Sequence, residues 1–267
     1  MKTALVTGAS SGIGQACAVH LGRSGWRVLA SVRRAGDAPE GTEEVLLDVT
    51  DGEQIRAAAG LVDQLDGLVN NAGIAIAAPV EFVPPEELRH QLEVNLVGQV
   101  AVTQAFLPAL RRARGRIVFM GSIAGKSALP FLSPYAASKH ALEALADSLR
   151  LELRPFGIHV SIIEPGTIQT AIWARSAQRA DELIAGADGQ LGELYGERIE
   201  AFRKIALKRG AAGAPAQKVA KVVLEALTAE RPHTRYLIGR DARLRAGFER
   251  LPDRLRDRIY ERVLLKG

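Results

Sequence analysis

Short apolar runs alternate with stretches of helical periodicity along most of this chain. The runs are rich in Val, Ile, Leu and Ala and show little polar alternation, which is typical of strands buried on both faces. We predict strands at residues 2–6, 27–32, 44–47, 67–69, 116–120, 159–163 and 236–238. Apolar residues three or four apart predict helices at 13–23, 52–64, 85–114, 134–154 and 215–229. This alternation predicts an α/β fold, a parallel sheet of about seven strands with helices on both faces.

Two segments fall outside this alternation. Residues 168–213 are rich in Ala and Gly and mixed in charge, and we interpret them as a mobile insertion or lid beside the substrate. The tail, residues 240–267, repeats apolar residues at steps of three and four, which predicts one amphipathic helical stripe with arginines opposite. The stripe consists of Leu244, Phe248, Leu251, Leu255, Ile259 and Val263. We expect residues 1–239 to form one domain and the tail to pack over it or line the substrate entrance. Contact with an anionic membrane surface is the alternative.

The composition limits the classes of protein that fit. A chain of 267 residues that is 47% hydrophobic and 24% charged suits one globular domain. No apolar run approaches the roughly 20 residues needed to cross a bilayer. The N-terminus enters a strand directly, so we predict no signal peptide. The single cysteine, Cys17, permits no internal disulfide and indicates a reducing, cytoplasmic location. The five histidines are scattered without metal-ligand spacing, so we predict no metal site.

The positive charge of the chain lies at its end. The net charge is +5, and residues 231–267 carry eleven Lys or Arg against five Asp or Glu, so the rest is near neutral. Acidic residues are interleaved with the basic ones, and no aromatic stacking platform accompanies them. We therefore predict no nucleic-acid partner.

A glycine-rich turn follows the first predicted strand. Gly8 and Gly12 permit backbone angles that a side chain would hinder, and their missing side chains let a phosphate approach the main chain. The helix that begins after Gly14 offers free N–H groups and the positive end of its dipole. We interpret the turn as the site of a dinucleotide pyrophosphate. The G-x-x-x-G-x-G spacing is not the G-x-G-x-x-G fingerprint, so a plain tight connection stays open at this point.

A tyrosine and a lysine four residues apart carry the strongest chemical signal. Ser133 can cap a helix whose first residue is Pro134, so Tyr135 and Lys139 share one helical face. A free phenol, with a pKa of about 10, is a poor base at neutral pH. A nearby ammonium favours the phenolate and makes proton exchange feasible. By itself the spacing also fits a solvated helix surface.

Polar residues at two strand ends and one on a helix add to this signal. Ser122 follows the strand that ends at Met120, at the edge where ligands bind on parallel sheets, and its hydroxyl is placed to hold a carbonyl or alcohol oxygen. The run Asn70–Gly73 ends the fourth strand, and a plain turn is the alternative interpretation. Asn95 interrupts an apolar helical face, so it requires a specific hydrogen-bonding partner, such as a water molecule.

Together these residues resemble the short-chain dehydrogenase/reductase family over nearly all of residues 1–232. The resemblance rests on Thr7–Gly14, Asp48, Asn70–Gly73, Asn95, Ser122, Tyr135, Lys139 and Pro165–Thr170. The chain is most similar to the retinol and hydroxysteroid dehydrogenase branch, at residues 113–116, 147–150 and 234–239. This implies a Rossmann-type domain and a homodimer or homotetramer assembled through the long helices. Gly121 departs from the pattern, because many relatives carry a second Ser there.

The resemblance also implies roles for these residues. Tyr135 is the general acid/base, Lys139 lowers its pKa and binds the nicotinamide ribose, and Ser122 positions the substrate oxygen. Asn95 anchors a water in a proton relay, and Asp48 bonds the adenine amino group. The expected cofactor-binding residues are Gly8, Ser10, Ser11, Gly12, Ile13, Gly14, Arg33, Arg34, Asp48, Val49, Asn71, Ala72, Gly73, Tyr135, Lys139, Pro165, Gly166, Ile168 and Thr170.

The end of the second strand indicates which nicotinamide cofactor binds. NAD-dependent relatives place an acidic side chain there for the ribose hydroxyls, whereas this chain has Val32 followed by Arg33 and Arg34. A carboxylate would repel a 2′-phosphate, and a guanidinium binds it with paired charge-assisted hydrogen bonds. We predict NADP(H). The alternative is that both arginines are solvated and the enzyme prefers NAD(H).

The segments expected to line the site are mainly apolar, which predicts a hydrophobic alcohol or carbonyl as the small-molecule substrate. The apolar residues are Ile74, Ile76, Leu129, Phe131, Ile172 and Trp173. We interpret the chain as an oxidoreductase that transfers a hydride to or from such a substrate. A regulatory protein that binds a dinucleotide without turnover is the alternative from another class, although its expected signature, the loss of Tyr135, Lys139 or Ser122, is absent.

Overall fold

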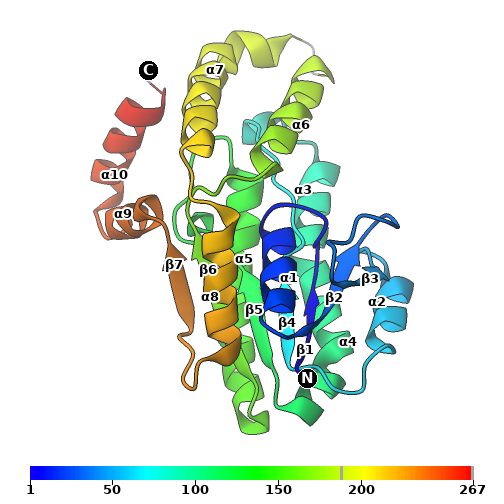
Figure 1. Ribbon diagram of the computed structural model, residues 1–267. Coiled ribbons are helices and arrows are strands. Elements are labelled where there is room, and N and C mark those ends of the chain that lie inside the picture. Colours follow the sequence, from blue (N-terminus) through cyan, green and yellow to red (C-terminus); the bar gives the residue numbers. More distant parts are fainter. Residues whose placement is uncertain (187–188, 266–267) are drawn as a thin grey trace.

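Seven parallel strands form one sheet at the centre of the computed structural model, which describes residues 1–186 and 189–265 (Figure 1). The strands are β1 (Thr3–Val6), β2 (Arg27–Val32), β3 (Glu43–Leu46), β4 (Gly67–Asn70), β5 (Arg116–Met120), β6 (His159–Pro165) and β7 (Arg235–Ile238). Their order is β3-β2-β1-β4-β5-β6-β7, so the sequence order reverses on either side of β1. Ligands on such sheets bind beyond the carboxyl ends of the strands at the reversal. The predicted α/β fold is confirmed.

Helices cover both faces of the sheet because the strands bury side chains on both sides. Ala4 and Val6 pack in one apolar layer with α1 and α8, and Leu5 between them packs in the other with α2, α4 and α5. In Figure 1, α1 and α8 lie in front of the sheet. These helices are α1 (Gly12–Arg23), α2 (Gly52–Ala59), α4 (Gly98–Ala113), α5 (Ser133–Leu153) and α8 (Ala216–Thr228).

Two of the predicted helices are shorter than expected. The helix predicted at 85–114 is divided into α3 (Pro85–Leu92), a π-helical turn (Glu93–Val97) and α4. The π turn carries Asn95, whose side chain bonds to backbone outside the helix, and such turns are often found at functional sites. The helix predicted at 52–64 ends at Ala59, where Gly60 is its C-cap.

Residues 168–213, interpreted from the sequence as a mobile insertion or lid, contain two helices that were not predicted. These are α6 (Ile172–Gly186) and α7 (Gln190–Ala211), and they stand over the carboxyl edge of the sheet in Figure 1. Leu191 is the one buried residue of α7. A helix that buries so little carries a weak apolar period, which is why the sequence pattern did not reveal it.

The tail forms two helices rather than one continuous stripe. They are α9 (Arg240–Phe248) and α10 (Asp253–Tyr260), followed by a π turn (Glu261–Leu265). Pro252 separates them, because proline disfavours helical backbone in the residue before it. None of the described helices is long and apolar enough to cross a membrane.

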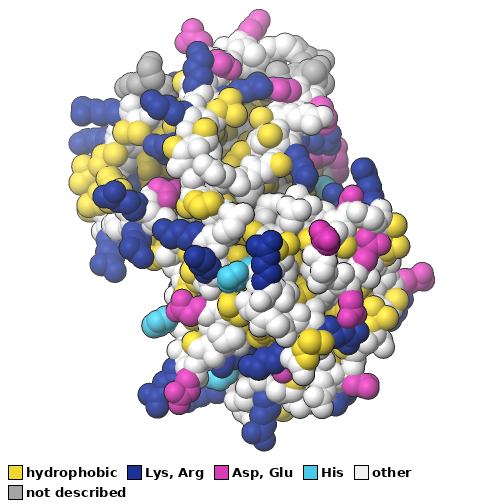
Figure 2. Space-filling view, viewed as in Figure 1, with side chains coloured by type: hydrophobic (Ala, Val, Ile, Leu, Met, Phe, Trp, Pro, Cys, Tyr) yellow, Lys and Arg dark blue, Asp and Glu magenta, His cyan; other side chains and the backbone are white. Residues whose placement is uncertain are grey.

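The tail packs against two loops at the carboxyl edge of the sheet. Arg245 of α9 donates to the Ser127 carbonyl oxygen at 2.7 Å, and the Tyr260 hydroxyl lies 2.9 Å from Ser127 Oγ. Asp241 accepts a hydrogen bond from the Thr167 backbone N–H at 2.6 Å. The outer side of the tail carries exposed apolar residues, Leu244, Leu255 and Val263, beside arginines, and Figure 2 shows this mixture over α9 and α10.

Candidate active site

The glycine-rich turn joins β1 to α1 and leaves no room for side chains. Gly8 and Gly12 have φ values of +65° and +60°, which only glycine adopts readily. A Cβ on Gly14 would lie 2.2 Å from the Gly8 carbonyl oxygen and 2.4 Å from Asn71 Nδ2. Ser11 is the N-cap of α1, but its side chain makes no capping hydrogen bond. The first N–H groups of α1 are therefore available to an anion.

The loop after β4 is tied to this turn by hydrogen bonds. Thr7 Oγ1 accepts from the backbone N–H groups of Asn71 and Ala72, at 2.9 and 3.0 Å. The Asn71 side chain donates to the Thr7 carbonyl oxygen at 2.8 Å. These bonds connect residues more than sixty positions apart and fix the floor of the site between β1 and β4.

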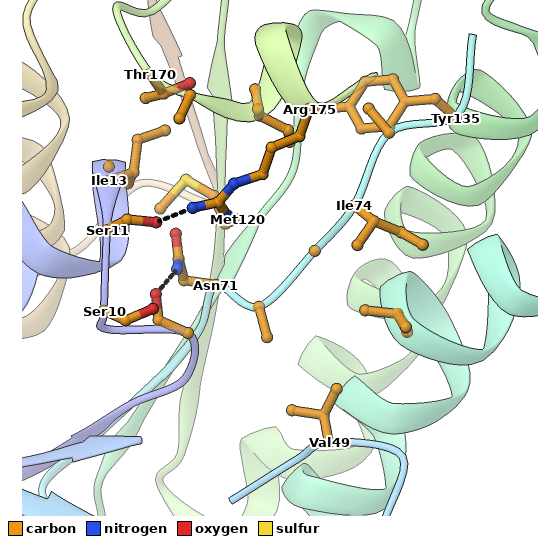
Figure 3. A pocket seen from close by; sticks show the side chains of 18 of the residues that line it. Ser10, Ser11, Ile13, Val49, Asn71, Ile74, Met120, Tyr135, Thr170 and Arg175 are labelled. Carbon is orange, nitrogen blue, oxygen red and sulfur yellow. Dashed lines mark hydrogen bonds between the residues drawn. The ribbon is translucent and has the colours of Figure 1, made fainter. Parts of the chain in front are cut away.

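A pocket of about 410 Å³ opens between the turn, the strand ends and α6 (Figure 3). It brings together most of the residues singled out in the sequence: Gly8, Ser10, Ser11, Gly12, Ile13, Arg33, Asp48, Val49, Asn71, Ala72, Gly73, Ser122, Tyr135, Pro165, Gly166, Ile168 and Thr170. Gly14, Arg34, Asn95 and Lys139 do not line it. Gly14 is needed for close packing of the turn, whereas Arg34 lies exposed on the loop after β2.

Tyr135 and Ser122 meet on one wall of this pocket. Tyr135 lies in the first turn of α5 and is 7% exposed; Ser122, just after β5, is 8% exposed. The helix starts at Ser133, with Leu132 rather than Ser133 as the N-cap. Ser122 Oγ accepts a hydrogen bond from the Ala124 N–H at 3.1 Å, so its own hydrogen can be donated to the Tyr135 hydroxyl or to a ligand.

Burial is the largest influence on the pKa values of the Tyr135 phenol and the Lys139 amine. It raises the pKa of Tyr135, although the Ser122 hydroxyl and the charge of Arg245 act in the opposite direction. This direction is opposite to the lowering expected from Lys139. Burial lowers the pKa of Lys139 to about 8, against the opposing influence of Glu143. Lys139 Nζ lies 5.7 Å from the centre of the Tyr135 ring and donates to the Met120 carbonyl oxygen at 2.7 Å.

Asn95 lies behind the pocket and holds the loop that lines it. Its Oδ1 accepts from the Ile74 N–H at 2.8 Å, and its Nδ2 donates to the Ile74 carbonyl oxygen at 3.0 Å and to Ser138 Oγ at 3.1 Å. The specific partner expected for this buried amide is therefore backbone and a serine hydroxyl. Gln91 and Gln99 add bonds to the same loop, and periodicity did not single out either residue.

The pocket also contains titratable residues that the sequence did not reveal. Glu87 and His90 line it from α3, and Arg175 and Arg179 line it from α6. The two arginines are four residues apart on one helical face. That spacing is the signal that would have identified them, had the helix been recognised.

The comparisons with known proteins agree with this geometry. The family described as short chain dehydrogenase matches residues 2–181 of the chain. The chain is a member of the short-chain dehydrogenase family. Retinol dehydrogenase 16 of Mus musculus is 38% identical to it, with 91% of this chain and 82% of that protein covered. The predicted resemblance to the family and to its retinol and hydroxysteroid dehydrogenase branch is confirmed.

Two further members carry a cofactor in their names. An NADPH-dependent 3-dehydrocapnine reductase of Ornithobacterium rhinotracheale is 35% identical, covering 100% of this chain and 98% of that protein. The crystal structure of a short chain dehydrogenase from Burkholderia cenocepacia J2315 in complex with NADP shares 27% identity and a TM-score of 0.74. It covers 99% of this chain and 100% of that chain. As a short-chain dehydrogenase, the chain is an oxidoreductase by family.

Proposed function

We propose that this short-chain dehydrogenase uses NADP(H) to interconvert a hydrophobic alcohol and its ketone or aldehyde, with Tyr135 as general acid/base. The observation that carries the proposal is the shared pocket. Ser122 and Tyr135 form one wall, and the glycine-rich turn and the start of α1 form the other. A dinucleotide extended between the two walls would bring its nicotinamide end to the hydroxyl pair.

The turn fits the diphosphate of such a cofactor. A Cβ at Gly8 would lie 3.0 Å from Ala72 Cα, and Gly14 has no room for a Cβ, so backbone rather than side chain faces the pocket. The uncapped start of α1 supplies N–H donors and the positive end of the helix dipole. Thr170 lies close to Gly12, since a Cβ there would be 3.3 Å from Thr170 Cγ2.

The residues at the other wall would move one proton. A bound nicotinamide supplies or accepts the hydride. Tyr135 donates its phenolic proton to the carbonyl oxygen during reduction and takes it back from the alcohol during oxidation. Ser122 donates a hydrogen bond to the same oxygen with the hydrogen that Ala124 leaves free. Protonated Lys139, close to the Tyr135 ring, favours the phenolate that remains after proton transfer.

The choice of NADP(H) is supported by the end of β2. Val32 and Arg33 line the pocket where an acidic side chain would select NAD(H). Arg33 is exposed there, and its guanidinium would bind a 2′-phosphate with paired hydrogen bonds. The NADPH-dependent relative and the NADP complex of the structural neighbour support the same cofactor.

A hydrophobic substrate is supported by the apolar side of the site. Ile74, Ile76, Ile172 and Trp173 line the main pocket, and Trp173 also borders a second cavity of about 70 Å³ under α6 and α7. Phe131 lines that cavity with a φ of +64°, a strained conformation for a side chain of this size. Leu129, expected to take part, lines neither space.

The test is a panel of ketones, aldehydes and alcohols assayed with all four nicotinamide cofactors, together with Tyr135→Phe. We expect NADPH-dependent turnover by the wild type, and a loss of kcat by a factor on the order of 10² to 10⁴ in the variant. Calorimetric NADPH affinity should stay within about twofold. Tyr236→Phe is the control, because Tyr236 is buried, 8% exposed, but lies outside the pocket.

Three outcomes would contradict parts of the proposal. A Tyr135→Phe enzyme with a third or more of the wild-type kcat would remove the phenol from the chemistry. A clear preference for NADH would refute the cofactor choice. NADPH binding without turnover of any panel member would favour a dinucleotide-sensing protein. The cytoplasmic location and the homo-oligomeric assembly expected from the sequence stay predictions.

A further inference from the structure

Arg175 reaches across the pocket from α6 to the glycine-rich turn. Its Nη2 lies 3.5 Å from Ser11 Oγ, and Figure 3 shows the side chain extending from the side of Tyr135 toward Ser11. The contact joins residues 164 positions apart. At this distance the hydrogen bond is weak, so Ser11 alone gives little reason for the guanidinium to lie there.

The charge of Arg175 has no acidic partner within the described part of the chain. Arg179, one turn further along the same helix, forms ion pairs with Glu87 of α3 and with Glu182. Asp48, the other carboxylate on the pocket wall, accepts hydrogen bonds from the Thr50 N–H and hydroxyl. The carboxylates that face the pocket are therefore occupied, and Arg175 presents an unpaired positive charge.

Two positive groups converge at this end of the pocket. The guanidinium of Arg175 lies beside Ser11, and Ser11 is the N-cap of α1, whose first N–H groups lack a side-chain acceptor. No acidic residue lies in the first turn of α1. A helix N-terminus and a free guanidinium both favour an anion, and the guanidinium adds a planar pair of donors that fits phosphate oxygens.

We propose that Arg175 binds the pyrophosphate of the dinucleotide and holds α6 over it. This inference rests on the proposed function, since it takes the dinucleotide as the occupant of the pocket. The segment that leads into α6 already lies close to the turn, because a Cβ on Gly12 would be 3.3 Å from Thr170 Cγ2. Arg33, which follows β2, and Arg175, beside Ser11, then serve different phosphates, the 2′-phosphate and the pyrophosphate.

The first experiment measures binding by calorimetry with three probes: NADPH, NADH and adenosine 2′-monophosphate. Arg175→Gln removes the charge but keeps hydrogen-bonding capacity, and Arg175→Lys keeps the charge. Arg209→Gln is the matched control, because Arg209 is exposed on α7 and does not line the pocket. We expect Arg175→Gln to weaken NADPH and NADH about tenfold each, as for a charge-assisted bond at an exposed site. Arg175→Lys should lose less, and adenosine 2′-monophosphate, which lacks a pyrophosphate, should bind unchanged.

The second experiment follows backbone hydrogen exchange in residues 172–183. NADPH should slow exchange there in the wild type, and this protection should be lost in Arg175→Gln while protection around the glycine-rich turn persists. This measurement does not depend on turnover, so it reports directly on whether Arg175 holds α6 over the bound dinucleotide.

The outcomes separate this inference from the proposed function. Wild-type protein that binds neither dinucleotide would refute the proposed function itself. Wild-type binding that Arg175→Gln leaves within twofold would overturn the inference alone. The inference would also be overturned if Arg175→Gln raised the KM of the carbonyl substrate but left dinucleotide affinity unchanged. Arg175 would then recognise an anionic group on the substrate. Equal loss in Arg209→Gln would also overturn it, since a general effect of removing positive charge would explain the result.

Discussion

Asn95 offers a direct measure of how strongly buried hydrogen bonds hold the pocket together. Its side chain is fully buried and makes three hydrogen bonds, two to the backbone of Ile74 and one to Ser138 Oγ. In Asn95→Ala, the Ile74 carbonyl keeps its bond from Gln91, and Ser138 keeps its bond to the Tyr135 carbonyl oxygen. The Ile74 N–H loses its acceptor, Asn95 Oδ1.

The magnitude follows from these contacts. Three buried bonds at about 1 kcal/mol each give a loss of about 3 kcal/mol in the free energy of unfolding. For a chain of this length, that corresponds to a fall in Tm of about 6–12 °C. The assay is urea unfolding followed by circular dichroism at one protein concentration, with and without NADPH.

The control is Gln104→Ala, on the exposed face of α4, which should change stability by no more than about 0.5 kcal/mol. A loss below about 1 kcal/mol for Asn95→Ala would refute the reasoning. It would mean that the loop after β4 finds other partners and that the π turn does not depend on this amide.

Three further outcomes are expected. Arg33→Gln should lower kcat/KM for NADPH about tenfold and leave NADH unchanged, whereas Arg34→Gln, outside the pocket, should alter neither; equal effects of both variants would contradict the assignment. Gly14→Ala should destabilise the fold by more than about 2 kcal/mol and abolish NADPH binding, because its Cβ would lie 2.2 Å from a backbone oxygen. Gly196→Ala in α7 meets nothing within 4 Å and should be neutral or stabilise by up to about 1 kcal/mol; similar losses at both glycines would exclude the steric explanation. Burial and a neighbouring carboxylate raise the pKa of Glu164 to about 7 from 4.5, so the folded state binds more protons than the unfolded state between these values. Stability contributed by this residue should therefore fall as the pH rises from 4.5 to 7, and parallel wild-type and Glu164→Gln stability curves over that window would show that the shift is absent.

The sequence by itself determined the sheet, most of the covering helices and much of the pocket wall. Strands buried on both faces leave continuous apolar runs, and helices packed on a core leave a period of three and four, so both can be read locally. The glycine-rich turn, Ser122 and Tyr135 each follow or precede such an element, and parallel strands place their carboxyl ends at one edge. Helix α7 was not predicted because it buries one side chain, Leu191, and leaves little periodic signal.

Only the tertiary structure decided which polar groups are already satisfied. Arg175 and Arg179 have the same local setting, four residues apart on one helix. Glu87, which pairs with Arg179, is 92 positions away, and Ser11, which faces Arg175, is 164 positions away. Likewise, Asn95 holds backbone 21 positions earlier in the chain. Local periodicity gives the direction of a side chain relative to its own helix. Whether a charge is paired, or an amide hydrogen-bonded, depends on groups that only folding brings within about 3 Å.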